Sequence, residues 1–312
     1  MSAVLLLCLV LLATFALATL LLSGVVAIAW RAGLSCKLDS AADLLALRLL
    51  PAAGGLLIVL TVVLPAFLSY EPHQEREAAG PVLLGLAAFA LATLGHGMWR
   101  GWRACAAART VLRSWGASQR PKFEGGQRIQ VIDAREPIVA VVGAWRPRVM
   151  AAECVIAACN PEEFRLVIAH EAAHISSRDN LKQLLLLACP DALAWTPLGT
   201  TLTQRWRAAT ELEADQRAAG HDPRNRVVLA AALIKVARTV GAAGRTSAAL
   251  AMPVASDDVA GRVRRLLAPP DSFPVTRVVG KFSWCVLLAP LTAVPLYALV
   301  HELIEVLVGF GL

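Results

Sequence analysis

The sequence predicts a mainly α-helical membrane protein in which four transmembrane helices accompany a cytosolic α+β domain with a small β-sheet. Hydrophobic residues make up 57% of the chain and charged residues 17%, and the mean hydropathy is +0.60. This hydrophobic share exceeds that of a soluble domain, which is about half apolar. Four long runs carry no charged residue, and the segment between the third and the fourth alternates short β-like runs with helical patterns.

The first three uncharged runs form a predicted membrane domain over residues 1–99. Its spans are expected at about 4–30, 49–70 and 78–99, each long enough for the roughly 20 apolar residues that cross a bilayer core. A fourth span is expected within 282–312, where an uncharged run is followed by a short tail.

Basic residues predict the orientation of these spans, because positively charged loops stay in the cytoplasm. The connection after the first span and the segment after the third are basic, whereas the connection after the second is acidic. We therefore expect a multi-pass protein of the inner (cytoplasmic) membrane with its N-terminus outside and residues 100–281 in the cytosol. The net charge of +7 then reflects loops beside the lipid bilayer, and no direct binding of nucleic acid is expected.

Residues 100–281 are expected to begin with a basic helix at 100–118 and a turn-rich break at 121–127. Strands are predicted at 128–133, 137–142 and 148–154, and helices at 164–176, 204–219, 227–240 and 259–267. The arginines of the last of these helices are expected at the anionic inner leaflet. The loop 241–258 fits a lid or a site of cleavage, and its role stays open, as does that of His96 inside the third span.

Two histidines at i and i+4 predict a metal centre. On a helix, His170 and His174 lie one turn apart on the same face, so that both imidazoles can reach one ion, and Glu171 lies beside them. Neutral imidazoles bind Zn²⁺, and a neighbouring carboxylate can take the proton of a water that attacks a peptide carbonyl. The spacing therefore predicts a zinc peptidase that holds one ion.

A second helical stretch supplies the third ligand that such a site requires. Glu211 follows His174 by about 37 residues, and Asp215, one turn further along, can bond a ligand histidine from outside the metal's own ligand set. Without the upstream histidines, Glu211, Glu213 and Asp215 would read as an acidic, solvated helix face. His221 fits either a hydrogen-bond donor to the transition state or a histidine in a surface turn.

The chain resembles the BlaR/MecR-type family of integral-membrane zinc peptidases, the antirepressors of beta-lactam resistance. The resemblance covers about 110–290 and rests on five motifs, with Thr196 where the family tends to have Asn: Gly143-Ala144-Trp145-Arg146-Pro147-Arg148-Val149, His170-Glu171-Ala172-Ala173-His174, Arg178-Asp179-Asn180, Trp195-Thr196-Pro197-Leu198, and Glu211 with Ala214-Asp215. It implies that His170, His174 and Glu211 bind zinc, that Glu171 is the general base, and that Asp215 supports the site from outside the ligand set, where we also place Asp179.

These patterns favour a membrane zinc endopeptidase that cleaves a cytosolic protein or peptide, and the resemblance implies that this substrate is a transcriptional repressor in a signalling pathway. Two alternatives stay open: a protease for the quality control of membrane proteins, and a non-catalytic signal transducer whose zinc is structural. The strand at 137–142 is expected to pair with an extended substrate. The oligomeric state, the inducing signal and the cleavage site stay open.

Overall fold

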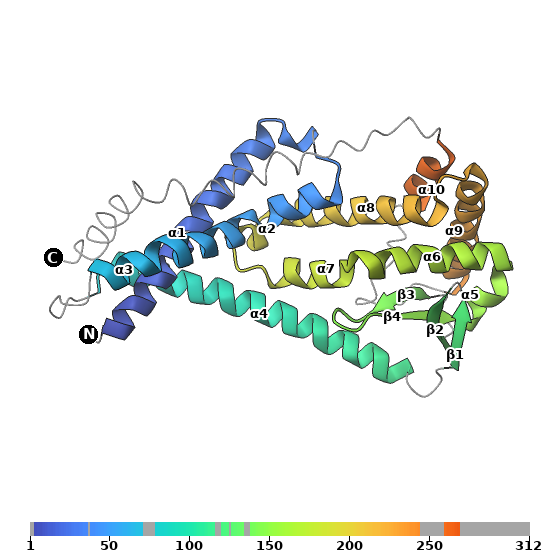
Figure 1. Ribbon diagram of the computed structural model, residues 1–312, viewed down its shortest axis with the longest axis horizontal. Coiled ribbons are helices and arrows are strands. Elements are labelled where there is room, and N and C mark those ends of the chain that lie inside the picture. Colours follow the sequence, from blue (N-terminus) through green and yellow to red (C-terminus); the bar gives the residue numbers. More distant parts are fainter. Residues whose placement is uncertain are drawn as a thin grey trace. The chain divides into compact units, whose positions relative to one another are not determined.

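The computed structural model describes residues 3–36, 38–70, 79–115, 120–124, 126–133, 138–243 and 259–268 (Figure 1). The chain divides into two compact units. Of the described residues, the first comprises 3–100 and 186–206, and the second comprises 101–185 and 207–268.

The first unit contains helices long and apolar enough to cross a membrane. The candidate spans are Val4–Arg31, Ala41–Leu68 and Pro81–Trp115, which agrees with the three spans predicted for the membrane domain. The fourth predicted span, within 282–312, lies outside the described residues. The elements of this unit are α1 (Ala3–Arg31), η1 (Leu34–Cys36), α2 (Ala41–Ile58), η2 (Val59–Val63, one π-helical turn), α3 (Leu64–Tyr70), the first part of α4 (Pro81–Trp115), η4 (Ala192–Trp195) and the start of α8 (Pro197–Ala219).

Two predicted span boundaries are corrected by the structure. The second helical run begins at Ala41 and not near residue 49, because the Ser40 hydroxyl caps it by accepting from the Ala42 N–H at 3.2 Å. The predicted basic helix at 100–118 is the continuation of α4 and ends at Trp115, since nothing in its Ala-rich sequence breaks the helix after Arg100.

A buried ion pair explains why α2 can include a charged residue that the uncharged run left out. Arg48 Nη1 lies 2.7 Å from Asp191 Oδ2, and both side chains are almost wholly shielded from solvent. Asp191 also accepts from the Cys189 thiol at 3.0 Å and from the Ala194 N–H at 3.1 Å, so that it caps η4. Arg48 therefore ties the second helical run to the segment that precedes α8.

A four-stranded mixed sheet forms one layer of the second unit. Its order is β1-β2-β4-β3, with β2 and β4 parallel and the two outer pairs antiparallel. The strands are β1 (Arg120–Glu124), β2 (Gln127–Ile132), β3 (Val139–Val142) and β4 (Arg148–Ala152). Strand β1 lies where a turn-rich break was predicted, because Gly126, at φ 79°, closes a tight hairpin that lets the preceding residues pair with β2.

Helices pack on this sheet and carry the site. The elements are α5 (Glu153–Ala158), α6 (Pro161–Ser177), α7 (Asp179–Ala188), the second part of α8, α9 (Pro223–Ala243) and α10 (Val259–Leu267). Phe164, Val167 and Ile168 of α6 share one core with the inner residues of β2 and β4. Burial of this face fixes α6 against the sheet. Glu171 and His174 follow Val167 at i+4 and i+7, so they lie on the same side of the helix, next to strand β3.

Breaking the buried pair of the first unit is expected to cost much more stability than breaking an exposed pair. Arg48→Gln leaves the Asp191 charge buried without its partner, and we expect a loss of about 3–5 kcal/mol. Asp39→Asn, which removes an exposed ion pair to Arg205 of 3.2 Å, is the control, with a loss of less than about 1 kcal/mol.

Denaturant titration of the full chain in detergent micelles measures both losses. The double variant Arg48→Met, Asp191→Asn removes both charges together and is expected to recover most of the stability that Arg48→Gln loses. Equal midpoints for Arg48→Gln and Asp39→Asn would contradict the importance of the buried pair.

Candidate metal centre

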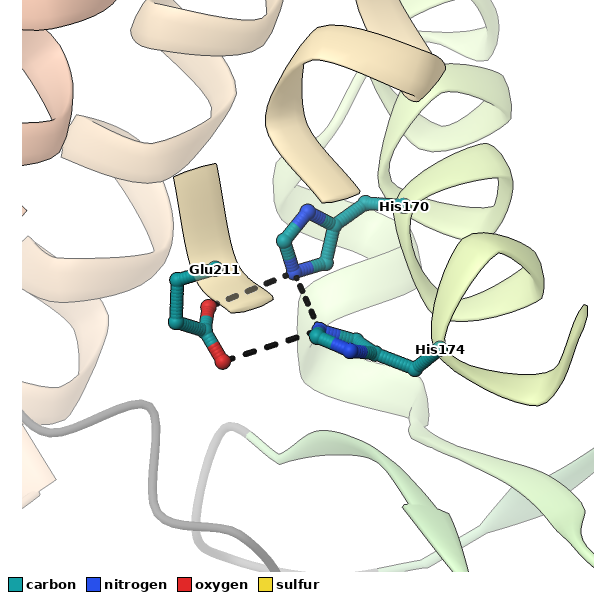
Figure 2. A group of neighbouring side chains, drawn as sticks. All are labelled: His170, His174 and Glu211. Atoms are coloured by element: carbon teal, nitrogen blue, oxygen red, sulfur yellow. Dashed lines mark hydrogen bonds and ion pairs between the residues drawn. The ribbon is translucent and has the colours of Figure 1, made fainter. Parts of the chain in front are cut away.

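Helix α6 brings the two histidines together. A capping box fixes its start, in which the Asn160 side chain accepts from the Glu163 N–H at 2.8 Å and the Glu163 carboxylate accepts from the Asn160 N–H at 2.9 Å. One full turn separates His170 from His174, and their Nε2 atoms lie 3.1 Å apart (Figure 2). Both side chains are buried.

Glu211 of α8 completes a group of three possible ligands. Its Oε2 lies 3.5 Å from His170 Nε2, and its Oε1 lies 3.6 Å from His174 Nε2. Figure 2 shows the carboxylate facing both rings. One ligand atom from each of the three residues lies within 4.8 Å of the others. Among the described residues, this is the group of His, Cys, Asp and Glu that could hold a metal ion.

The geometry of these atoms fits a zinc ion. Tetrahedral ligands at 2.0–2.1 Å from zinc lie about 3.3 Å from one another, close to the separations of the three residues. Two imidazole nitrogens that face each other at 3.1 Å cannot both carry a proton. The buried Glu211 Oε2 forms an ion pair with Arg262 Nη1 at 3.0 Å but accepts no hydrogen bond in the described part of the chain. A cation among these atoms would satisfy all three.

Two further carboxylates orient the imidazole rings. Asp215 Oδ1 lies 2.9 Å from His170 Nδ1, and Asp179 Oδ2 lies 2.9 Å from His174 Nδ1. In each pair the Nδ1–H can donate to the carboxylate, which leaves the lone pair of Nε2 free to bind an ion. Lys182 holds the other oxygen of Asp179 at 3.2 Å.

Arg262 of α10 is the group that the sequence analysis missed. Its guanidinium is buried and lies 2.6 Å from Asp215 Oδ1 and 3.0 Å from Glu211 Oε2. The sequence had instead predicted that the arginines of α10 lie at the membrane surface. The signal was present in the spacing, because Arg262 and Leu266 are both buried at i and i+4, while Arg264 is exposed. An arginine on the apolar face of a helix indicates an ion pair inside the domain.

The charges of the site favour a bound cation. Four carboxylates, those of Glu171, Asp179, Glu211 and Asp215, face two cationic side chains, those of Lys182 and Arg262. One divalent ion would balance the remaining two negative charges. Burial raises the pKa of Glu211 and Asp215, but the hydrogen bond from His170 and the charge of Arg262 outweigh it and lower both pKa values to about 2.

The excess of negative charge at the site also raises the pKa of His170. Burial lowers its pKa, but the hydrogen bonds to Asp215 and Glu211 outweigh burial and raise the pKa to about 9. Without an ion, His170 is therefore protonated below a pH of about 9.

A pocket opens onto the three possible ligands. It is lined by Glu171, Asn180 and residues of β3 together with His170, His174 and Glu211. The Asn180 amide donates to the carbonyls of Val141, at 2.9 Å, and Gly143, at 3.1 Å, so the start of α7 is anchored to the end of β3. His221 lies elsewhere, in an exposed turn after α8, which favours its interpretation as a surface histidine.

Metal binding is expected to weaken as the pH falls. An ion must displace the proton that His170 holds below a pH of about 9, so the apparent affinity should fall by about tenfold for each pH unit below that value. Asp215→Asn removes the partner that raises the pKa of His170 and should flatten this dependence. Calorimetric titration with Zn²⁺ at several pH values, in buffers of different ionisation enthalpy, measures the affinity and the number of protons released. A wild-type affinity that is constant from about pH 7 to 9 would contradict this expectation.

The comparisons with known proteins concern the same region. Residues 122–266 match the family model described as BlaR1 peptidase M56. No curated protein matches the chain. The matched residues include most of the sheet, the helices that carry the histidines and Glu211, and nearly all of α10. This match supports the resemblance found in the sequence: residues 122–266 are similar to the BlaR1 peptidase M56 family.

Proposed function

We propose that the chain is a membrane-embedded, zinc-dependent endopeptidase that cleaves a protein on the cytosolic side. One observation carries this proposal: His170, His174 and Glu211 meet at the pocket that Glu171 and β3 also line. The match of residues 122–266 to a peptidase family model and three candidate membrane spans support it. The orientation, with the N-terminus outside and residues 100–281 in the cytosol, rests on the distribution of basic residues.

In this proposal His170, His174 and Glu211 hold the ion, and Glu171 is the general base. The zinc ion, when bound, would polarise a water molecule and the peptide carbonyl. Glu171 lies in the pocket beside the histidines and would accept the proton of the attacking water and then pass it to the leaving amine. Asp215 and Asp179 hold the two rings in the tautomer that presents Nε2 to the ion.

Strand β3 offers a place for the substrate backbone. It is an edge strand of the described sheet, and three of its residues line the pocket. The Ala152 N–H donates to the Ile138 carbonyl at 2.8 Å, and Ala140 pairs with Met150. The backbone groups of Val139 and Val141 therefore point to the other side, where the Val141 carbonyl already accepts from Asn180 and the Val139 groups face the edge. An extended peptide could bond to that edge without any requirement for one sequence.

The substrate that we propose is a cytosolic transcriptional repressor, as the resemblance to antirepressors implies. A protease for membrane-protein quality control would use the same site, and the identity of the cleaved proteins separates the two roles.

Replacement of Glu171 should remove proteolysis while metal binding is retained. We expect Glu171→Gln to lower cleavage by about 10²–10⁴-fold, because the amide cannot accept the proton. Glu213→Gln is the matched control, since Glu213 lies on α8 near Glu211 but pairs with Arg217 at 3.1 Å, and it should leave cleavage unchanged. Quantitative proteomics of protein N-termini in cells with wild type and each variant measures cleavage and names the substrates.

Zinc content of the purified proteins is measured in parallel. Full cellular function and unchanged N-termini in cells with Glu171→Gln would instead favour the signal transducer with a structural ion.

A proline in β3 should impair substrate binding more than folding. Val139→Pro removes an N–H at the free edge, so we expect cleavage of the substrates found above to fall by about tenfold, the cost of roughly one hydrogen bond to a peptide. Phe123→Pro is the control, because β1 is the opposite edge strand, already contains Pro121, and exposes Phe123. Unchanged cleavage by Val139→Pro would rule out pairing along β3.

A further inference from the structure

Helix α10 places the positively charged side chain of Arg262 at the metal centre. Arg262 Nε and Nη2 lie 2.9 Å and 2.6 Å from the two oxygens of Asp215, so the guanidinium binds this carboxylate through two parallel contacts. Its third nitrogen, Nη1, lies 3.0 Å from Glu211 Oε2. One side chain thus contacts both a possible ligand and the carboxylate that orients His170.

The position of this guanidinium is fixed by the packing of α10. Leu266 packs in a buried cluster with Leu166 of α6 and Leu229 of α9. Arg226 of α9 donates to the carbonyls of Arg265, at 3.0 Å, and Ala268, at 2.8 Å, and so satisfies the unpaired carbonyls at the end of α10. The helix is therefore held at its core-facing side and at its C-terminal end.

The contact with Arg262 gives the two oxygens of the Glu211 carboxylate different surroundings. Oε2 lies 3.0 Å from Arg262 Nη1 and 3.5 Å from His170 Nε2, while Oε1 lies 3.6 Å from His174 Nε2. A carboxylate that binds an ion through both oxygens fills two positions, whereas catalytic zinc sites keep one position open for water. A guanidinium on Oε2 competes with an ion for that oxygen and so favours Oε1 as the ligand atom.

We propose that Arg262 is a positioning residue of the metal centre, an inference that rests on the proposed metal-binding function. Through Asp215 it fixes His170 in the tautomer that binds an ion, and through Glu211 Oε2 it makes that residue a ligand with a single oxygen. The planar guanidinium is required for this role, because a lysine ammonium at the same place could not make three contacts in fixed directions.

Metal affinity and the spectrum of bound Co²⁺ test this role in the full-length chain purified in detergent. Zn²⁺ competition against a chromophoric chelator should show a loss of about 10–100-fold for Arg262→Ala. Arg262→Lys keeps the charge without the planar guanidinium and should show a smaller loss. Arg264→Ala changes an exposed arginine of the same helix and should bind like wild type.

The Co²⁺ spectrum reports on the number of ligands and not on stability alone. Wild type and Arg264→Ala are expected to give the strong visible absorption of a four-coordinate ion. Both Arg262 variants should give a weaker band, since Glu211 can then bind through both oxygens. Because Arg262 acts partly through Asp215, the loss of affinity in Arg262→Ala, Asp215→Asn should be smaller than the combined effect of the single variants.

The outcomes separate this inference from the proposed function. A wild-type chain that binds no stoichiometric Zn²⁺, or binds it equally well as His170→Ala, would overturn the proposed function. Wild-type binding that depends on His170, with unchanged affinity and spectrum in Arg262→Lys, would overturn only the role of Arg262. Tighter binding by Arg262→Ala would also overturn that role, because it would mean that the guanidinium competes with the ion. If Arg262→Ala unfolds, which its thermal melting shows, Arg262→Lys decides.

Discussion

The contact between two imidazoles and one carboxylate is the constraint on which the second unit depends. The Nε2 atoms of His170 and His174 face each other at 3.1 Å, and Glu211 lies opposite them. Such a group is costly inside a protein unless every atom has a partner. The capped start of α6, the carboxylates behind the rings and the arginine of α10 all supply partners, so much of the fold around the site serves to keep these polar groups buried.

Local sequence predicted the parts of the structure that depend on neighbours in the chain. The spacing of His170 and His174 required a helix, and Asn160 and Pro161 marked its start, which the capping box confirms. Three apolar runs appear as candidate spans. The predicted ligand set lies together, although its role in binding an ion and in catalysis stays a prediction.

Local sequence patterns did not predict the contacts between residues far apart in the chain. Arg262 meets Asp215 across 47 residues and Arg48 meets Asp191 across 143, and no local pattern identifies the carboxylate that either arginine meets. As a result, α10 was expected at the membrane surface and the second span was expected to start too late. Strand β1 was missed for a related reason, since its pairing depends on one glycine turn and on β2. In both ion pairs the structure buries an arginine, and a buried arginine requires a partner.

The central claim is that one zinc ion is held by nitrogen and oxygen atoms of His170, His174 and Glu211. X-ray absorption at the zinc edge, on the full-length chain purified in detergent, measures this directly. The account predicts one ion per chain with imidazole nitrogen and oxygen neighbours at about 2.0–2.2 Å, and loss of this signal in His170→Ala. Sulfur neighbours at about 2.3 Å, or a signal unchanged by His170→Ala, would contradict it.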